Sequence, residues 1–326
     1  MSVSRLAGVV AAVAIGWGSA GAAQAYTVYI SNEKGNSLTV IDSETLSVLT
    51  TIPVGQRPRG IMLTKDDTKV LICASDSDTV QVLDVASRKI VADLPSGPDP
   101  ELLNIHPSGS PVYVANEDDS LLTVIDLKTK EVVAEVEVGV EPEGVGVSPD
   151  GKTVVVTSET SNMAHFIDTA TYEITDNVLV GQRPRFADFT ADGSQLWVTS
   201  EVAGTATVVD AKTRKIVKVI EFAIPGVQPE YIQPVGVRVS EDGTKAFVAL
   251  GPANRVAVID AKSFEVEDYL LVGKRVWQLA FTPDQKLLFA TNGNSNDVSV
   301  IDVPSLKVIK SIPTGNAPWG VTISKE

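Results

Sequence analysis

The chain has 326 residues and carries 27 Lys and Arg against 41 Asp and Glu, which gives a formal net charge of −14 at pH 7. This balance excludes a nucleic-acid-binding protein, because such proteins need clustered Lys and Arg that the sequence lacks. The acidic charge instead favours solubility, or attraction to a basic partner.

The N-terminal segment has the pattern of a secretory signal peptide. Arg5 precedes an apolar run from Leu6 to Ile15, and small residues stand at Ala23 and Ala25. The apolar run is too short to span a membrane. We therefore expect cleavage after Ala25, so that residues 1–25 are the signal peptide and residues 26–326 form a periplasmic protein without membrane insertion.

The single cysteine is predicted to be structural. Cys73 lies in the apolar run from Val70 to Ala74, where a small buried residue fits. With one cysteine, the exported chain has no intrachain disulfide, so its stability must come from packing.

A Val-Ile-Asp tripeptide, or a close variant, returns seven times along the mature chain. Successive copies of its aspartate are 42 residues apart, except for one interval of 50. Repetition this regular indicates one supersecondary unit copied seven times. The aspartates are Asp42, Asp84, Asp126, Asp168, Asp210, Asp260 and Asp302.

Each copy contains four short apolar runs. In one copy they cover residues 143–148, 153–157, 165–168 and 173–180, with the tight turn Ser148-Pro-Asp-Gly151 between the first two. Runs rich in Val, Ile and Thr and bounded by Gly, Pro, Asp and Asn predict strands. Four antiparallel strands per unit at a period near 42 residues predict an all-β fold, the seven-bladed β-propeller.

The two ends of the mature chain predict how the ring closes. Residues 319–324 match the first strand of a unit, whereas residues 26–31 match the second. Pairing these N- and C-terminal strands closes one domain, 26–326, and removes exposed sheet edges. The expected blades are 58–99, 100–141, 142–183, 184–233, 234–275, 276–317, and 318–326 plus 26–57.

One face of the predicted disc collects the residues that differ between copies. We call it the top face. It carries the loops that lead into each innermost strand and the loops between second and third strands. Charged and aromatic side chains there exceed what the turns need, so we expect a partner or ligand site around the channel mouth, with the long loop 220–233 as a rim. The alternative is that Arg and Glu only pair across adjacent loops and solubilise the face. The candidate binding residues are Arg57, Arg59, Glu101, Glu143, Arg183, Arg185, Glu201, Arg275, Trp277 and Trp319.

No metal site and no catalytic residue are expected. Met163 and His165 form a Met-x-His pair of the kind that binds copper, but the other histidine, His106, lies at a turn in a different blade. The acidic loops 75–78 and 117–119 lack the spacing of a calcium loop. Motifs of hydrolases, zinc proteases and phosphate-binding loops are absent from the sequence, so we expect a non-catalytic protein with no cofactor of its own.

Some segments of the repeats resemble a known family. Ile52-Pro-Val-Gly55 with Pro58, followed by strands ending in Val-Ile-Asp, resembles the YVTN-type β-propeller repeat of exported bacterial proteins. Residues 73–82, 98–101, 115–119, 158–168 and 249–255 resemble seven-repeat propellers associated with pyrroloquinoline quinone (PQQ)-dependent catabolism of alcohols.

This resemblance implies an accessory role in periplasmic alcohol oxidation, by association only. The partner it implies is a quinoprotein dehydrogenase, its cytochrome or an ABC-transport component. Two alternatives stay open at this point: a propeller enzyme such as a lactonase, and a binder of PQQ or an organic acid whose carboxylates the arginines would hold.

Overall fold

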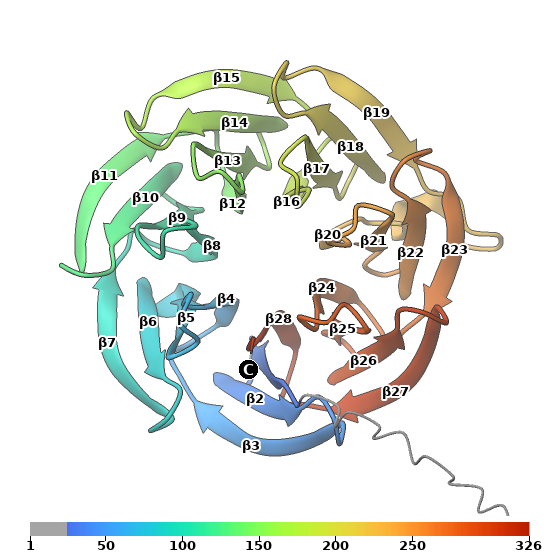
Figure 1. The fold of residues 1–326 in the computed structure, drawn as a ribbon, viewed down its shortest axis with the longest axis horizontal. Coiled ribbons are helices and arrows are strands. Elements are labelled where there is room, and N and C mark those ends of the chain that lie inside the picture. The colour runs from blue at the N-terminus through green and yellow to red at the C-terminus, as the bar shows by residue number, and fades with distance from the viewer. Residues whose placement is uncertain (1–24, 326) are drawn as a thin grey trace, which may run out of the picture.

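The computed structural model describes residues 25–325, so the predicted signal peptide lies outside the described residues except for Ala25. Seven four-stranded antiparallel sheets stand around a central axis as blades of a ring (Figure 1). The prediction of an all-β, seven-bladed β-propeller is confirmed. Within the described range no helix is long and apolar enough to cross a membrane.

The strands run from the channel outward in each blade, and two 3-10 turns, η1 (Ser75–Ser77) and η2 (Pro229–Tyr231), lie in loops. The first blade contains β4 (Pro58–Leu63), β5 (Lys69–Ala74), β6 (Thr79–Asp84) and β7 (Lys89–Pro95), and the second β8 (Pro100–Ile105), β9 (Val112–Asn116), β10 (Leu121–Asp126) and β11 (Glu131–Glu137). The third contains β12 (Pro142–Val147), β13 (Thr153–Ser158), β14 (Met163–Asp168) and β15 (Ile174–Leu179), and the fourth β16 (Pro184–Phe189), β17 (Gln195–Ser200), β18 (Thr205–Asp210) and β19 (Ile216–Glu221). The fifth contains β20 (Val237–Val239), β21 (Lys245–Ala249), β22 (Arg255–Asp260) and β23 (Val266–Leu271), and the sixth β24 (Val276–Phe281), β25 (Leu287–Asn292), β26 (Asp297–Asp302) and β27 (Lys307–Pro313). The seventh contains β28 (Pro318–Ile323), β1 (Thr27–Asn32), β2 (Ser37–Asp42) and β3 (Ser47–Pro53).

The seventh blade closes the ring with strands from both ends of the chain. β28 pairs antiparallel with β1, with Val28 opposite Ile323 and Tyr29 opposite Thr322. The predicted closure is therefore confirmed.

The repeat aspartates hold the turns that follow the third strand of each blade. Asp42 Oδ1 accepts a hydrogen bond from the backbone N–H of Thr45 at 2.7 Å and another from Glu44 at 3.0 Å. The bond from Thr45 is the main cause that holds the pKa of Asp42 below its usual value. Each of the other six aspartates accepts a backbone N–H from the residue three positions later. These residues therefore have a structural role.

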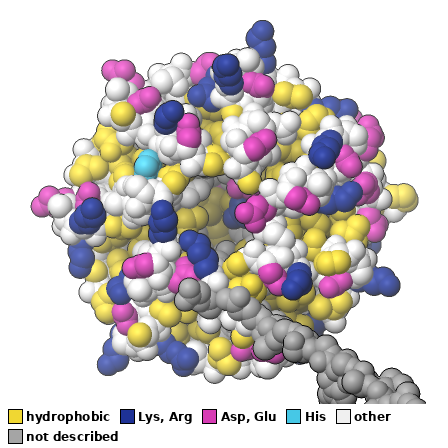
Figure 2. Space-filling model, viewed as in Figure 1, with side chains coloured by type: hydrophobic (Ala, Val, Ile, Leu, Met, Phe, Trp, Pro, Cys, Tyr) yellow, Lys and Arg dark blue, Asp and Glu magenta, His cyan; other side chains and the backbone are white. Residues whose placement is uncertain are grey.

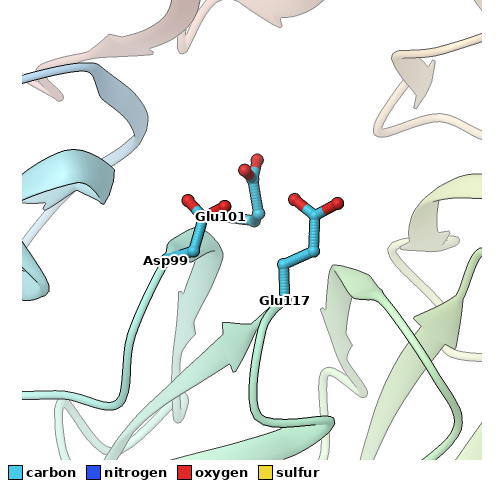
Figure 3. Close-up of side chains that lie close together, drawn as sticks. All are labelled: Asp99, Glu101 and Glu117. Carbon is cyan, nitrogen blue, oxygen red and sulfur yellow. The ribbon is translucent and has the colours of Figure 1, made fainter.

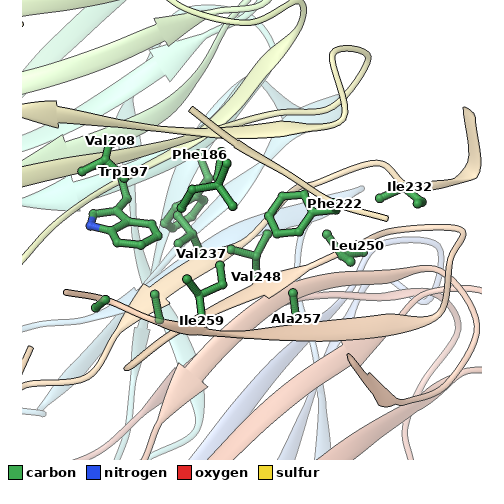
Figure 4. Close-up of a cluster of buried hydrophobic side chains, with 14 of the residues drawn as sticks. Phe186, Trp197, Val208, Phe222, Ile232, Val237, Val248, Leu250, Ala257 and Ile259 are labelled. Carbon is green, nitrogen blue, oxygen red and sulfur yellow. The ribbon is translucent and has the colours of Figure 1, made fainter. Parts of the chain in front are cut away.

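The hydrophobic core is divided among the blade interfaces. Seven clusters of buried side chains each centre on the contact between two neighbouring blades, and the cluster of the fourth and fifth blades also includes Leu102 and Trp319 from the channel wall. The cluster between the fourth and fifth blades includes Phe186, Trp197 and Val248 (Figure 4). Cys73 is fully buried between the first and second blades, and burial raises the pKa of its thiol well above the usual value, which fits a structural residue.

The innermost strands of neighbouring blades approach one another closely below the top face. One equivalent position near the start of each innermost strand alternates between glycine and a larger side chain around most of the ring. A Cβ on Gly320 would lie 2.4 Å from the Arg59 carbonyl oxygen, and one on Gly60 would lie 2.5 Å from that of Glu101. Glycine is required at such close approaches of backbone. In ring order the seven positions are Gly60, Leu102, Gly144, Phe186, Gly236, Gln278 and Gly320.

Candidate functional site

The structure brings the ten candidate residues of the channel mouth into one layer on the top face. They form two groups of ion pairs, with the two tryptophans beside them. Three of the arginines, Arg57, Arg183 and Arg275, have a positive φ of 51° to 57° at equivalent loop positions. The left-handed residue is followed in each loop by the first residue of an innermost strand, so this loop geometry belongs to the repeat.

The first group surrounds Glu101, which is fully buried. Arg57 Nη2 donates to its Oε1 at 3.1 Å, and Arg59 Nη1 donates to its Oε2. Arg57 also donates to Asp99 at 2.6 Å, and Arg59 Nε donates to Glu33 at 3.1 Å. Burial acts to raise the pKa of Glu101, but the two guanidiniums outweigh it and lower that pKa below its usual value.

The second group surrounds Arg185, which is also buried. Its Nη2 lies 2.9 Å from Glu143 Oε1, and its Nη1 donates to Glu159. Glu201 lies 3.6 Å from the same Nη1, and Arg183 Nε lies 2.8 Å from the second oxygen of Glu159. Burial raises the pKa of Glu143 well above its usual value, although Arg185 acts to lower it.

The tryptophans complete the layer by stacking against arginines. The Arg275 guanidinium lies 4.1 Å from the ring centroid of Trp277, and that of Arg59 lies 5.1 Å from Trp319. The two indole rings are 6.3 Å apart. Arg275 also donates to Glu201 at 2.7 Å. Each arginine is therefore held by a carboxylate, an aromatic ring or both.

This arrangement has a chemical consequence for binding. An external carboxylate that bound Arg59 or Arg185 would have to compete with the buried glutamate that each arginine contacts, and separating such a buried pair is costly. Arg and Glu therefore pair across adjacent loops, as the alternative interpretation of the sequence proposed. Much of this pairing is buried rather than exposed. Arg183 is the exception in exposure, with 48% of its side chain accessible.

Three carboxylates, two of them members of the first group, form a trio that the sequence patterns did not predict. One oxygen each of Asp99, Glu101 and Glu117 lie within 4.8 Å of one another, and the three side chains extend into the same space (Figure 3). Burial, and then the charge of Glu101, raise the pKa of Glu117 to about 8. The same two causes raise the pKa of Asp99 to about 6, against the opposing effect of Arg57. Such a trio can share protons or hold a divalent cation. The signal was available, because Glu117 precedes Asp126 by the same nine residues that separate Glu33 from Asp42.

Exposed carboxylates continue outward from this trio. They lie on the loops between β5 and β6 and between β9 and β10, which adjoin the trio on the top face. Asp78 accepts the backbone N–H of Asp99 at 3.2 Å, which ties the loop between β5 and β6 to the loop between β7 and β8. We call the exposed residues the acidic sector: Asp76, Asp78, Asp118 and Asp119.

His165 is occupied by contacts within its own blade. Its Nε2 accepts the backbone N–H of Gly139 at 3.0 Å, so Nδ1 carries the proton and donates to Asn177 Oδ1 at 2.5 Å. Burial lowers the pKa of His165 below its usual value. In the described part of the chain, the only group of three or more His, Cys, Asp or Glu placed to hold a metal is the trio of Asp99, Glu101 and Glu117, and neither Met163 nor His165 belongs to it.

Two family sequence models match parts of the chain. The cytochrome D1 heme domain matches residues 64–183, and the seven-bladed β-propeller lactonase matches residues 20–92. Each match covers less than half of the chain, and together they support the propeller fold. The search of curated proteins found no match.

Several solved structures share the fold. Hydrazine synthase of Kuenenia stuttgartiensis is 23% identical, with a TM-score of 0.78 over 85% of this chain and 92% of that chain. A functionally unknown protein from Desulfotomaculum acetoxidans DSM 771 is 16% identical, with a TM-score of 0.77 over 91% and 98%. Dihydro-heme d1 dehydrogenase NirN in complex with DHE is 16% identical, with a TM-score of 0.69 over 91% of this chain and 74% of that one. At these identities the likeness shows the fold alone.

The residues at the mouth do not suit a haem held by histidine. The chain has two histidines. His165 is bonded within its blade, and both ring nitrogens of His106 contact Ser108 and Gly151 at a turn away from the top face. Directly below the mouth, the channel is lined by the buried apolar side chains of Leu102 and Phe186.

Proposed function

We propose that this protein is an exported, non-catalytic β-propeller that serves as an accessory binding protein in PQQ-dependent alcohol catabolism. It docks a periplasmic protein partner with a basic surface on the acidic sector of the top face. The observation that carries this proposal is the exposed carboxylates of the acidic sector beside a channel mouth whose own arginines are already paired.

The division of charge favours docking by the acidic sector over docking by the arginines. Arg59 and Arg185 are held by buried glutamates, so they contribute a rigid floor. Asp118 and Asp119 are exposed and directly follow Glu117 of the trio, so their carboxylates face solvent beside the channel mouth. Complementary charge of this kind speeds association and selects partners more than it adds affinity.

The signal-peptide pattern and the family resemblance support the location and the pathway. Among the partners that the resemblance implies, a cytochrome or quinoprotein dehydrogenase with a basic face would complement the acidic sector. PQQ itself belongs to the pathway in this proposal and not to the mouth, because its carboxylates would have to displace Glu101 or Glu143 from the arginines.

Affinity purification from the periplasm of cells grown on an alcohol tests the proposal. The bait is the wild-type protein or a variant in which all four residues of the acidic sector are changed to Asn, a substitution that keeps the acceptor that Asp78 presents to Asp99. The matched control changes four exposed glutamates on the outer rim to Gln, namely Glu131, Glu135, Glu137 and Glu173.

A basic protein should co-elute with the wild type and with the rim control, and it should be lost from the acidic-sector variant and at high salt. Equal recovery of the same protein by all three baits would contradict docking at this surface. Recovery of a partner with no part in alcohol oxidation would contradict the pathway but not the surface.

A lactonase is the second candidate, favoured by the family match over residues 20–92 and by the carboxylate trio. It requires a bound metal and turnover of a lactone. Metal analysis and a lactone panel, run on the wild type and on Glu117→Gln, decide this alternative. Metal-dependent hydrolysis that Glu117→Gln abolishes would establish it, whereas a metal-free and inactive protein would remove it.

A further inference from the structure

A cavity of about 220 Å³ lies in the central channel and is lined by the innermost strands of all seven blades. We call it the lower cavity. Its lining includes Leu102, Phe186 and Gln278 from the layer just below the mouth. It also includes Asn104, Asp188 and Arg238, which lie two residues after Leu102, Phe186 and Gly236. The face of the propeller where the C-terminus lies is hollowed at its centre, with hydrophobic side chains in the hollow and charged ones at its edge (Figure 2).

The lower cavity contains a buried amide without a partner. Gln278 is 4% exposed, and neither its Oε1 nor its Nε2 has a hydrogen-bond partner among residues 25–325. The neighbouring strand presents Gly236, where a Cβ would lie 2.9 Å from that Oε1. The indole N–H of Trp319, another lining residue, is also buried and unpaired within the described chain. Unpaired buried polar groups are costly and rare, so these point to a molecule that supplies the missing partners.

The charges of the lower cavity cancel. Arg238 Nη1 lies 3.5 Å from Asp188 Oδ1, and both side chains are about one quarter exposed. The Arg238 guanidinium also lies 4.5 Å from the ring centroid of Phe186. An anion would compete with Asp188 for Arg238, and a cation would compete with Arg238 for Asp188. The remaining lining is largely apolar, with Ile61, Met62 and Leu102.

We propose that the lower cavity binds a small uncharged molecule with a hydrogen-bond donor and acceptor on an apolar body, and that Gln278 recognises its polar end. A cavity of about 150 Å³ accepts benzene. The lower cavity is larger than that, so it accepts a benzene-sized body with one polar substituent. This site uses no residue of the acidic sector and stands independently of the proposed partner.

Titration with benzamide, followed by calorimetry or protein NMR, tests the site. Toluene, benzoate and benzylamine share the ring but lack the polar group or carry a charge. The variant is Gln278→Leu, which removes the amide and keeps the size, and the matched control is Gln228→Leu at an exposed loop position. Unfolding midpoints establish that the variants fold, and Gln278→Asn, which shortens the reach of the amide, replaces Gln278→Leu if the latter does not.

Benzamide should bind more tightly than the two charged probes. Its affinity should fall about tenfold in Gln278→Leu and stay unchanged in Gln228→Leu. Toluene should bind Gln278→Leu at least as well as it binds the wild type. The proposal is overturned if benzamide shows no saturable binding at millimolar concentration, if benzoate or benzylamine binds more tightly, or if the Gln278 variant binds benzamide as tightly as the wild type.

Discussion

Nη2 of Arg185 lies 2.9 Å from Oε1 of Glu143, and both side chains are almost completely buried at the mouth of the channel. A buried pair of this kind contributes little net stability when intact, because desolvation of the two charges offsets their attraction. Removing one partner is different, since the other charge stays buried without compensation. The mouth should therefore tolerate single charge changes poorly.

Arg185→Met tests this directly. The variant leaves the buried Glu143 without its arginine and leaves Glu159 with Arg183 alone, and we expect it to lower the free energy of unfolding by about 3–5 kcal/mol. Urea denaturation at neutral pH measures the loss. Lys152→Ala is the control, because its ion pair with Asp150 spans 3.7 Å with 81% of the lysine side chain exposed. It should change stability by less than about 0.5 kcal/mol, and an equally small effect of Arg185→Met would contradict the role given to the buried pair.

Glu117 should make the propeller less stable as the pH rises. Its pKa is about 8 in the folded state against an ordinary value of 4.5, so between these values the folded protein keeps a proton that the unfolded chain has lost. Its contribution to the free energy of unfolding is therefore largest at or below pH 4.5 and is lost as the pH rises toward about 8. Glu117→Gln should flatten the stability profile over this window in denaturation curves recorded at a series of pH values. Glu131→Gln, at an exposed rim position, should leave the profile as it is in the wild type.

His165 should have the opposite pH dependence. Burial lowers its pKa below 6.5, so below that pH the unfolded chain binds a proton that the folded state resists. Its contribution is complete above pH 6.5 and is lost as the pH falls through the folded pKa. His165→Thr, with the residue that β2, β10 and β18 carry at this position, should remove this acid sensitivity and cost about 1–2 kcal/mol at neutral pH through lost hydrogen bonds.

The matched control for His165 is His106→Ser, because serine or threonine occupies the equivalent turn position in other blades. Stability measurements between neutral and mildly acidic pH separate the two histidines. If the loss of stability at acid pH persists in His165→Thr and disappears in His106→Ser, the effect comes from His106 and the prediction is wrong.

The number of blades and the ring closure could be predicted because they depend on local signals. Strand composition, turn residues and a fixed interval are all read along the chain, and the matching ends at Tyr29 and Thr322 follow from that interval. The partners of the mouth arginines could not be predicted in the same way. Arg59 reaches Glu101 in the next blade, whereas Arg275 reaches Glu201, 74 residues away, and such choices depend on side-chain conformations in three dimensions.

The lower cavity is an intermediate case. Gln278 stands where four of the seven blades carry glycine, so the position is conspicuous in the sequence. That its amide lacks partners depends on how neighbouring innermost strands converge, which no interval along the chain reveals.

The same convergence predicts the effect of adding a single methyl group at Gly320. A Cβ there would lie 2.4 Å from the Arg59 carbonyl oxygen and 2.8 Å from Ser31 Oγ, and backbone atoms on the channel wall cannot rotate away as a side chain would. Gly320→Ala should therefore separate β28 from β4 and lower the free energy of unfolding by about 1–3 kcal/mol, measured by chemical denaturation. Gly226→Asn is the control, because no atom lies within 4 Å of the added Cβ and asparagine tolerates the positive φ of 79°. If both variants unfold at the wild-type denaturant concentration, close approach of the inner strands does not explain the glycines of the channel wall.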